Sequence, residues 1–148
     1  MGKRGKKGRF FEYRDERNAD LLCVFRECVM NSPADESMDE VYQRIVNSKS
    51  KRFWVSEEQA SKVVSYMMKG NKIDYMSDNK RKMFEEIYIR VMKMREENPN
   101  IRLFRLVEII VSQEAPCFYM TSGSAKVIIS QIKSKWCKRR LQLLPFLR

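Results

Sequence analysis

The chain has 148 residues, 43% of them hydrophobic and 33% charged, which suits one ordinary domain or two very small ones. Its five glycines and four prolines are few, which favours long helices over many short strands. No apolar run reaches the roughly 18 residues that cross a bilayer, and no apolar stretch of a secretory signal follows the basic N-terminus. We therefore expect a cytoplasmic protein without a membrane partner, associated with the nucleoid if it is bacterial.

The net charge of +11 is concentrated at the two ends of the chain. Residues 1–9 carry five basic and no acidic side chains, and residues 117–148 carry seven basic and no acidic ones. The rest of the chain sets 18 basic residues against all 19 acidic ones. Such ends are typical of a protein with a polyanionic partner, although a solvated tail and a solvated helix face would give the same pattern.

The first half of the chain predicts three helices. The first helix begins within residues 14–18, and its apolar positions recur at helical spacing. Ser37 and Ser56 are each followed three residues later by glutamate or glutamine, the pattern of a capping box that opens a second and a third helix. Gly70 is the expected end of the third helix.

The second half repeats this plan at an offset of 65 residues. Phe-Trp-Val-Ser at 53–56 falls on Phe-Tyr-Met-Thr at 118–121, and the neighbouring apolar positions keep their spacing. Repeats of this kind indicate an internal duplication of one fold. An apolar linker is best covered, so we expect the copies to pack together. The expected parts are a basic tail at 1–12, repeat 1 at 13–70, a linker at 71–76, repeat 2 at 77–142 and a C-terminal tail at 143–148.

Nothing in the sequence indicates an enzyme. Histidine is absent, which removes the commonest general base and metal ligand, and the phosphate-loop and nucleophile-elbow motifs are missing. We therefore predict no catalytic residues, no metal and no cofactor. The four cysteines lack metal-ligand spacing and are expected to be reduced and mostly buried; they are Cys23, Cys28, Cys117 and Cys137.

The aromatic residues before the third helix of each copy have two interpretations. Phe53 and Trp54 in one copy, and Phe118 and Tyr119 in the other, could stack on bases. Their equivalent positions before a helix favour the second interpretation, in which they plug the core. Trp136 continues an apolar helical stripe among basic residues and is also assigned to the core.

Residues 38–69 and 103–135 each resemble the helix-turn-helix class of DNA-binding domains. In both segments a second helix leads through a turn to a capped third helix, but the turn is longer than usual and lacks the glycine of that class. The helix patterns and the repeat together predict an all-α fold of two duplicated three-helix, helix-turn-helix-like units packed together. The resemblance implies that a third helix enters the major groove of DNA.

The two third helices differ in charge. The first opens with Glu57 and Glu58, which repel phosphate, whereas the second opens with small and hydroxyl residues and carries only basic charges. We therefore expect the second to contact nucleic acid, together with the N-terminal tail. The candidate contact residues are Lys3, Arg4, Lys6, Lys7, Arg9, Thr121, Ser122, Ser124, Lys126, Ser130, Lys133, Lys135, Lys138, Arg139 and Arg140.

The sequence therefore favours a small regulator or architectural factor that binds duplex DNA, for example from a mobile element or a phage. Two alternatives stay open. The protein could be an adaptor or structural component of a larger assembly, with a protein partner or a second copy of itself, because it has ten methionines and several exposed-looking apolar residues. It could also bind RNA, which the basic ends would suit equally well.

Overall fold

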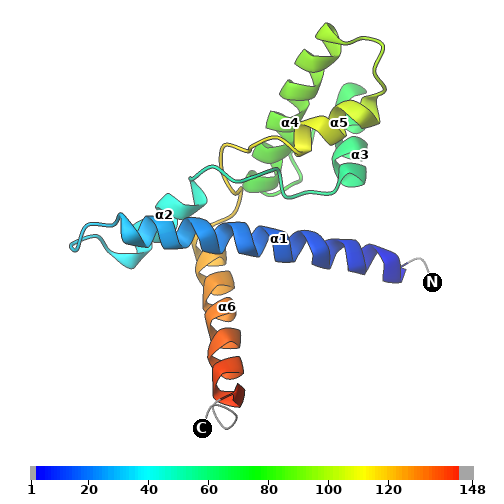
Figure 1. Cartoon of the computed structure of the whole chain (residues 1–148). Coiled ribbons are helices and arrows are strands. Elements are labelled where there is room, and N and C mark those ends of the chain that lie inside the picture. The colour runs from blue at the N-terminus through cyan, green and yellow to red at the C-terminus, as the bar shows by residue number, and fades with distance from the viewer. Residues whose placement is uncertain (1–2, 144–148) are drawn as a thin grey trace.

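The computed structural model describes the backbone of residues 3–143 and the side chains of residues 13–135 (Figure 1). Over these residues the chain is all-helical, as predicted, with one isolated β-bridge and no strand. The helices are α1 (Lys3–Met30), α2 (Met38–Val46), α3 (Glu57–Met68), α4 (Asp78–Glu97), α5 (Leu103–Val111) and α6 (Ser122–Leu143).

Short polar residues fix several helix ends where the sequence predicts them. The Ser37 and Ser56 hydroxyls accept hydrogen bonds from backbone N–H groups three residues later, at 3.3 and 3.2 Å, and so cap α2 and α3. Gly70 follows α3 with φ of +90°, a left-handed conformation that glycine adopts without steric cost. These caps confirm the predicted starts of α2 and α3 and the end of α3.

The basic segment at the N-terminus is helical rather than a separate tail. Helix α1 begins at Lys3, well before the predicted start within residues 14–18. The segment contains no proline, and its lysines, arginines and Glu12 are good helix formers, so Gly5 and Gly8 do not stop the helix. Positions 3–9 therefore belong to the first turns of α1.

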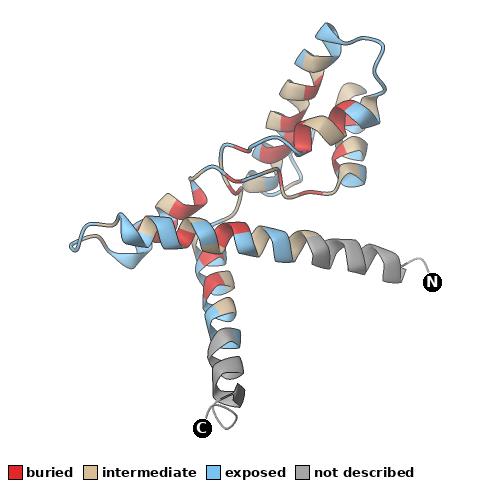
Figure 2. Ribbon diagram, in the orientation of Figure 1, coloured by how far each residue is buried: buried red, intermediate tan, exposed pale blue. Residues whose placement is uncertain are grey.

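The six helices form two three-helix units, each with its own core (Figures 1 and 2). Helices α1, α2 and α6 pack on one another, and so do α3, α4 and α5. The first core contains Leu21, Phe25, Val41, Tyr42, Ile45, Val46, Phe118, Ala125 and Ile129. The second contains Phe53, Val55, Ala60, Val64, Ile73, Met83, Phe84, Ile87, Val91, Leu106, Val107, Ile110, Val111 and Ala115.

The expected units of three consecutive helices are therefore wrong, because the third helices are exchanged. Among the described residues α3 packs on α4 and α5, and α6 packs on α1 and α2. The helix-turn-helix pairs predicted at 38–69 and 103–135 do not form, because α2 does not pack on α3 and α5 does not pack on α6. The cause is the direction of the connecting segments, which run on into the other unit instead of turning back.

The two connecting segments pair with each other where they cross. Ser50 and Ala115 form an antiparallel bridge in which each N–H bonds the other carbonyl, at 3.1 and 3.0 Å. Just beyond the bridge, the Phe53 N–H donates to the Val111 carbonyl and the Phe118 N–H donates to the Val46 carbonyl, both at 3.0 Å. All these contacts obey the 65-residue offset. They are the pattern that a duplication predicts, and the duplication itself stays an interpretation.

The aromatic pair in each connection is divided between the two cores. Phe53 is fully buried with α3, α4 and α5, and Phe118 is buried with α1, α2 and α6. The next residue faces the opposite unit in each case, so Trp54 packs against the first core and Tyr119 against the second. The Tyr119 ring stacks on the Phe53 ring, with 6.0 Å between the ring centres. The backbone of Tyr119 has a φ of +53°. Burial of both phenylalanines supports core packing over base stacking.

Removing either buried phenylalanine should destabilise the whole fold, because each fills the core at a crossing. We expect Phe53→Ala and Phe118→Ala each to lower the free energy of unfolding by about 3–5 kcal/mol. Urea denaturation measures this change. Phe104→Ala on α5 is the matched control, because that ring is 45% exposed and its loss should cost about 0.5 kcal/mol or less. Equal stability of all three variants would contradict the packing described.

Candidate nucleic-acid interface

Helix α6 is held in place by the apolar face of its first half. Ala125 and Ile129 are fully buried against α1 and α2, and Ile128 is partly buried beside them. The start of the helix is fixed by the Thr121 hydroxyl, which accepts the Ser124 N–H at 3.1 Å. Lys126, Ser130 and Lys135 are exposed, as predicted for contact residues.

Helix α6 carries charge of one sign only. Its 22 residues contain six lysines and arginines and no aspartate or glutamate. Figure 1 shows its second half running beyond α1 and α2, away from the rest of the molecule. The equivalent helix α3 contains Glu57, Glu58 and Lys62 over 12 residues. A strong positive potential is therefore expected along α6 but not along α3.

Several predicted contact residues already have partners within the chain. Ser122 accepts a hydrogen bond from the Gln43 side chain of α2 at 3.0 Å, and Thr121 donates its hydroxyl to Ser124 at 2.9 Å. The Lys133 ammonium lies 4.3 Å from the centre of the Phe25 ring, a cation–π contact. Ser122 and Lys133 therefore lie beside the packed face of α6, where each contacts a side chain of its own unit.

Other predicted contact residues are placed only by their backbone. Their side chains lie outside the described residues, but their positions belong to the first turns of α1 and to the second half of α6. They are Lys3, Arg4, Lys6, Lys7, Arg9, Lys138, Arg139 and Arg140. The Trp136 side chain likewise lies outside the described residues.

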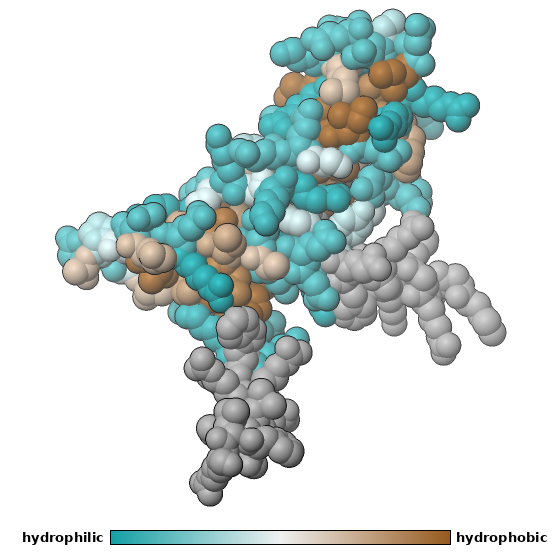
Figure 3. Space-filling view, in the orientation of Figure 1, coloured by the Kyte–Doolittle hydropathy of each residue, from teal (hydrophilic) through white to brown (hydrophobic). Residues whose placement is uncertain are grey.

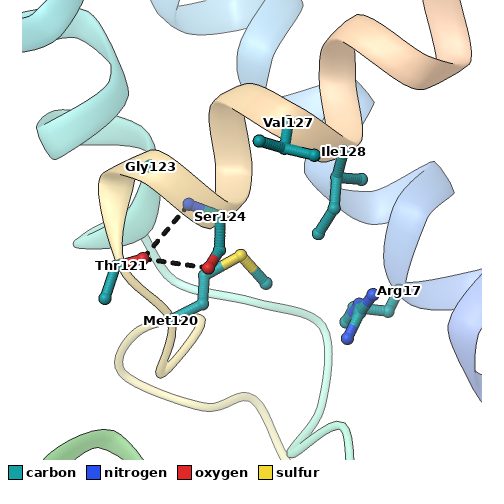
Figure 4. Close-up of a pocket in the computed structure, with 7 residues that line it drawn as sticks. All are labelled: Arg17, Met120, Thr121, Gly123, Ser124, Val127 and Ile128. Atoms are coloured by element: carbon teal, nitrogen blue, oxygen red, sulfur yellow. Dashed lines mark hydrogen bonds between the residues drawn. The ribbon is translucent and has the colours of Figure 1, made fainter.

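An open pocket of about 550 Å³ separates the start of α6 from α1 (Figure 4). Its rim combines a guanidinium with hydroxyl and apolar groups, from Arg17, Met120, Thr121, Gly123, Ser124, Val127 and Ile128. Burial, together with the nearby charge of Arg14, lowers the pKa of Arg17 from its ordinary value. Arg17 was not predicted as a site residue, because no local pattern connects it with a helix more than 100 positions later in the chain.

The first turn of α3 is held by side chains of α1 and of the first connecting segment. The Tyr13 hydroxyl donates to the Glu57 carboxylate at 2.6 Å, and an Arg52 nitrogen lies 3.4 Å from the other Glu57 oxygen. The Arg52 guanidinium lies 4.6 Å from the centre of the Tyr13 ring and 5.6 Å from that of Trp54. We call Tyr13, Arg52 and Glu57 the α1–α3 clamp.

A buried carboxylate joins α1 to the same connecting segment. Asp20 is only 4% exposed and accepts the Lys51 backbone N–H at 2.9 Å. The same carboxylate oxygen accepts the Trp54 indole N–H at 3.3 Å. Two donors thus satisfy this buried charge, which would otherwise be costly. Asp20 therefore anchors the crossing segment to α1, about two helical turns from Tyr13 of the clamp.

The clamp perturbs both of its acidic groups. Burial alone would raise the pKa of Glu57, but the Tyr13 hydrogen bond and the Arg52 charge outweigh burial and lower that pKa below its usual 4.5. Burial, followed by the hydrogen bond to Glu57, raises the pKa of Tyr13. The folded clamp is therefore a charged carboxylate bound by a neutral phenol.

The rest of the described surface is mixed. Figure 3 shows groups of hydrophobic residues on a mainly hydrophilic face, and the most exposed large ones are Met30 (84%), Tyr75 (73%) and Ile89 (60%). The expectation of mostly buried thiols is wrong for the described cysteines, because Cys23 is exposed and Cys28 and Cys117 are only partly buried; the Cys137 side chain lies outside the described residues. Over the described residues, no helix combines the length and apolar character needed to cross a membrane.

Comparison with known proteins adds nothing to this geometry. No protein family, curated protein or solved structure matches the chain. The case for a function therefore depends on the charges and contacts described above.

The lowered pKa of Glu57 predicts an acid-sensitive contribution to stability. It should be present above the ordinary pKa of about 4.5 and be lost as the pH falls through the lower folded value. Glu57→Gln should therefore be less stable than the wild type near neutral pH, and the difference should shrink as the pH falls below the ordinary pKa of glutamate. Denaturation at several pH values measures it. Glu96→Gln, at an exposed position of α4, is the control, and a difference independent of pH would contradict the prediction.

Proposed function

We propose that the protein binds duplex DNA through α6 and the basic first turns of α1, as a small regulator or architectural factor. The observation that carries the proposal is the composition of α6, which has six basic residues and no acidic one. Among its described side chains, Ala125 and Ile129 are buried, whereas Lys126, Ser130 and Lys135 are exposed. These exposed side chains can meet a partner.

Duplex DNA suits this helix in both charge and size. DNA carries closely spaced phosphates, and lysines and arginines that neutralise them release counterions, which supplies most of the non-specific affinity. The major groove is about 12 Å wide and admits one α-helix. A projecting basic helix can therefore lie between two rows of phosphates, with Lys126 and Ser130 exposed near its start.

The contrast with α3 supports a single reading helix. The first turn of α3 holds two acids, which would repel phosphate. One of them, Glu57, is also bound by Tyr13 of α1. The corresponding turn of α6 has no acid and borders an open pocket. We therefore propose that α6 contacts DNA and that α3 does not.

A second candidate function is protein binding, as an adaptor in a larger assembly. The specific observation in its favour is the exposure of large apolar side chains, above all Met30 and Ile89. Exposed apolar groups of this kind are used at adaptable binding surfaces. These residues lie outside α6, so the two functions would use different surfaces.

Binding to a panel of nucleic acids tests the proposal. Electrophoretic shifts with duplex DNA, single-stranded DNA and structured RNA should show the tightest binding to the duplex, with affinity that falls steeply as salt rises. Tighter binding to RNA would reassign the partner. Weak binding that is equal for all three and vanishes near physiological salt would refute the proposal and favour the adaptor.

A charge reversal at the start of α6 tests which helix reads the DNA. Lys126→Glu should weaken binding to one duplex by about tenfold or more at low salt, because it turns a close attraction into a repulsion. Ser61→Glu, at the equivalent position of α3, should have less effect. Melting curves of both variants control for folding. Equal losses would mean that both helices contact DNA, and a loss only for Ser61→Glu would mean that α3 is the reader.

A further inference from the structure

The N-terminal part of α1 extends far beyond the core of its own unit. Among the side chains of α1 that the structure describes, none of residues 13–19 is buried, and burial begins at Asp20 and Leu21. The 18 residues from Lys3 to Asp20 span about 27 Å at the usual rise per residue. Figure 1 shows this part running from the α1–α2–α6 unit past the start of α3.

Side chains, rather than helix packing, hold this extension. No described helix outside its own unit packs along α1. Asp20 bonds the crossing segment at the inner end of this stretch, and the α1–α3 clamp joins its Tyr13 to the start of α3 through the 2.6 Å hydrogen bond to Glu57. Arg52 is in turn fixed by two backbone carbonyls, those of Phe53 and Val55, each at 3.1 Å. The clamp therefore joins α1 to a rigid part of the crossing.

Such support matters because a single helix without packing is marginally stable in water. The basic positions 3–9 end only about one turn before Tyr13. The clamp therefore contacts α1 at a point where it can support the turns that precede it.

We infer that α3 is the positioning element of the interface, because its Glu57, together with Tyr13 and Arg52, holds the basic start of α1 in a fixed direction relative to α6. This inference rests on the proposed binding of DNA, and it gives α3 a role in that binding. Helix α6 would contact the DNA, and α3 would orient a second contact, made by the start of α1, with the same DNA.

The equivalent positions of the other copy support a dedicated clamp. The offset is 65 residues for the connecting segment and third helix, and 66 for the first helix, where Phe25 falls on Val91. Asn79, Cys117 and Ser122 then stand where Tyr13, Arg52 and Glu57 stand in the first copy. Helix α4 begins at Asp78 and has no basic extension to hold. The three clamp residues therefore occur in the half of the chain that has an extension and are replaced together in the half that lacks one.

A distance measurement tests the clamp without any nucleic acid. Spin labels at Arg9→Cys and Lys80→Cys, in a chain whose four native cysteines are serine, report the position of α1 relative to the α3–α4–α5 unit. Tyr13→Phe keeps the ring and removes the hydrogen bond, so it should broaden the distance distribution. Tyr75→Phe, at an exposed tyrosine, is the matched control. An unchanged distribution in both Tyr13→Phe and Glu57→Gln would overturn the inference.

A double-mutant cycle tests whether the clamp acts through the basic residues. Tyr13→Phe should weaken binding to a duplex by about three- to tenfold. The same change should have almost no effect in a chain that carries Lys3→Gln, Arg4→Gln, Lys6→Gln, Lys7→Gln and Arg9→Gln. That background should itself flatten the slope of log affinity against log salt by up to about 4–5 units.

The outcomes separate the inference from the proposed function. Equal losses from Tyr13→Phe in both backgrounds, or no loss in the full chain, would overturn the positioning role while leaving DNA binding intact. A wild-type chain that does not bind DNA would refute the proposed function and, with it, the role of the clamp in binding. Melting curves of each variant show whether the effect comes from loss of folding.

Discussion

The crossing of the two connecting segments is the constraint on which the rest of the structure depends. Paired main-chain hydrogen bonds between Ser50 and Ala115 fix the two segments side by side, and two more tie them to the ends of α2 and α5. Because the segments cannot turn back from there, α3 and α6 enter opposite units. The burial of Phe53 and Phe118 then stabilises each entry from the inside.

Local patterns predict the helices well but not their partners. The serine caps, the glycine stop and the two buried phenylalanines all follow from residue type and spacing. The exchange of α3 and α6 does not, because duplicated helices with similar apolar faces fit either core. The course of the connecting segments decides which core each helix enters, and the residue composition of those segments does not predict that course. The early start of α1 was missed for a different reason, since its basic residues read equally well as a tail.

The candidate interface was predictable in charge but not in geometry. The excess of basic residues and the lack of acids in α6 can be read directly from the sequence. Contacts between distant residues cannot, and these include the Tyr13–Glu57 hydrogen bond, the Gln43–Ser122 hydrogen bond and the place of Arg17 opposite α6. Glu57 shows the limit best, because its sequence context suggests only an acid at the start of a helix that repels phosphate, whereas in the fold it binds a tyrosine of α1.

The exchange of helices also determines the order in which the molecule can be completed during synthesis. The core formed by α1 and α2 lacks its third wall until α6 leaves the ribosome, although α2 ends at Val46 and α6 begins only at Ser122. Contacts so distant along the chain form slowly, because a long loop must close first. The nascent chain must therefore carry Leu21 and Ile45 partly uncovered through most of its synthesis. The α3–α4–α5 unit, whose helices are consecutive, can close earlier and serve as the template on which the ends of the chain assemble.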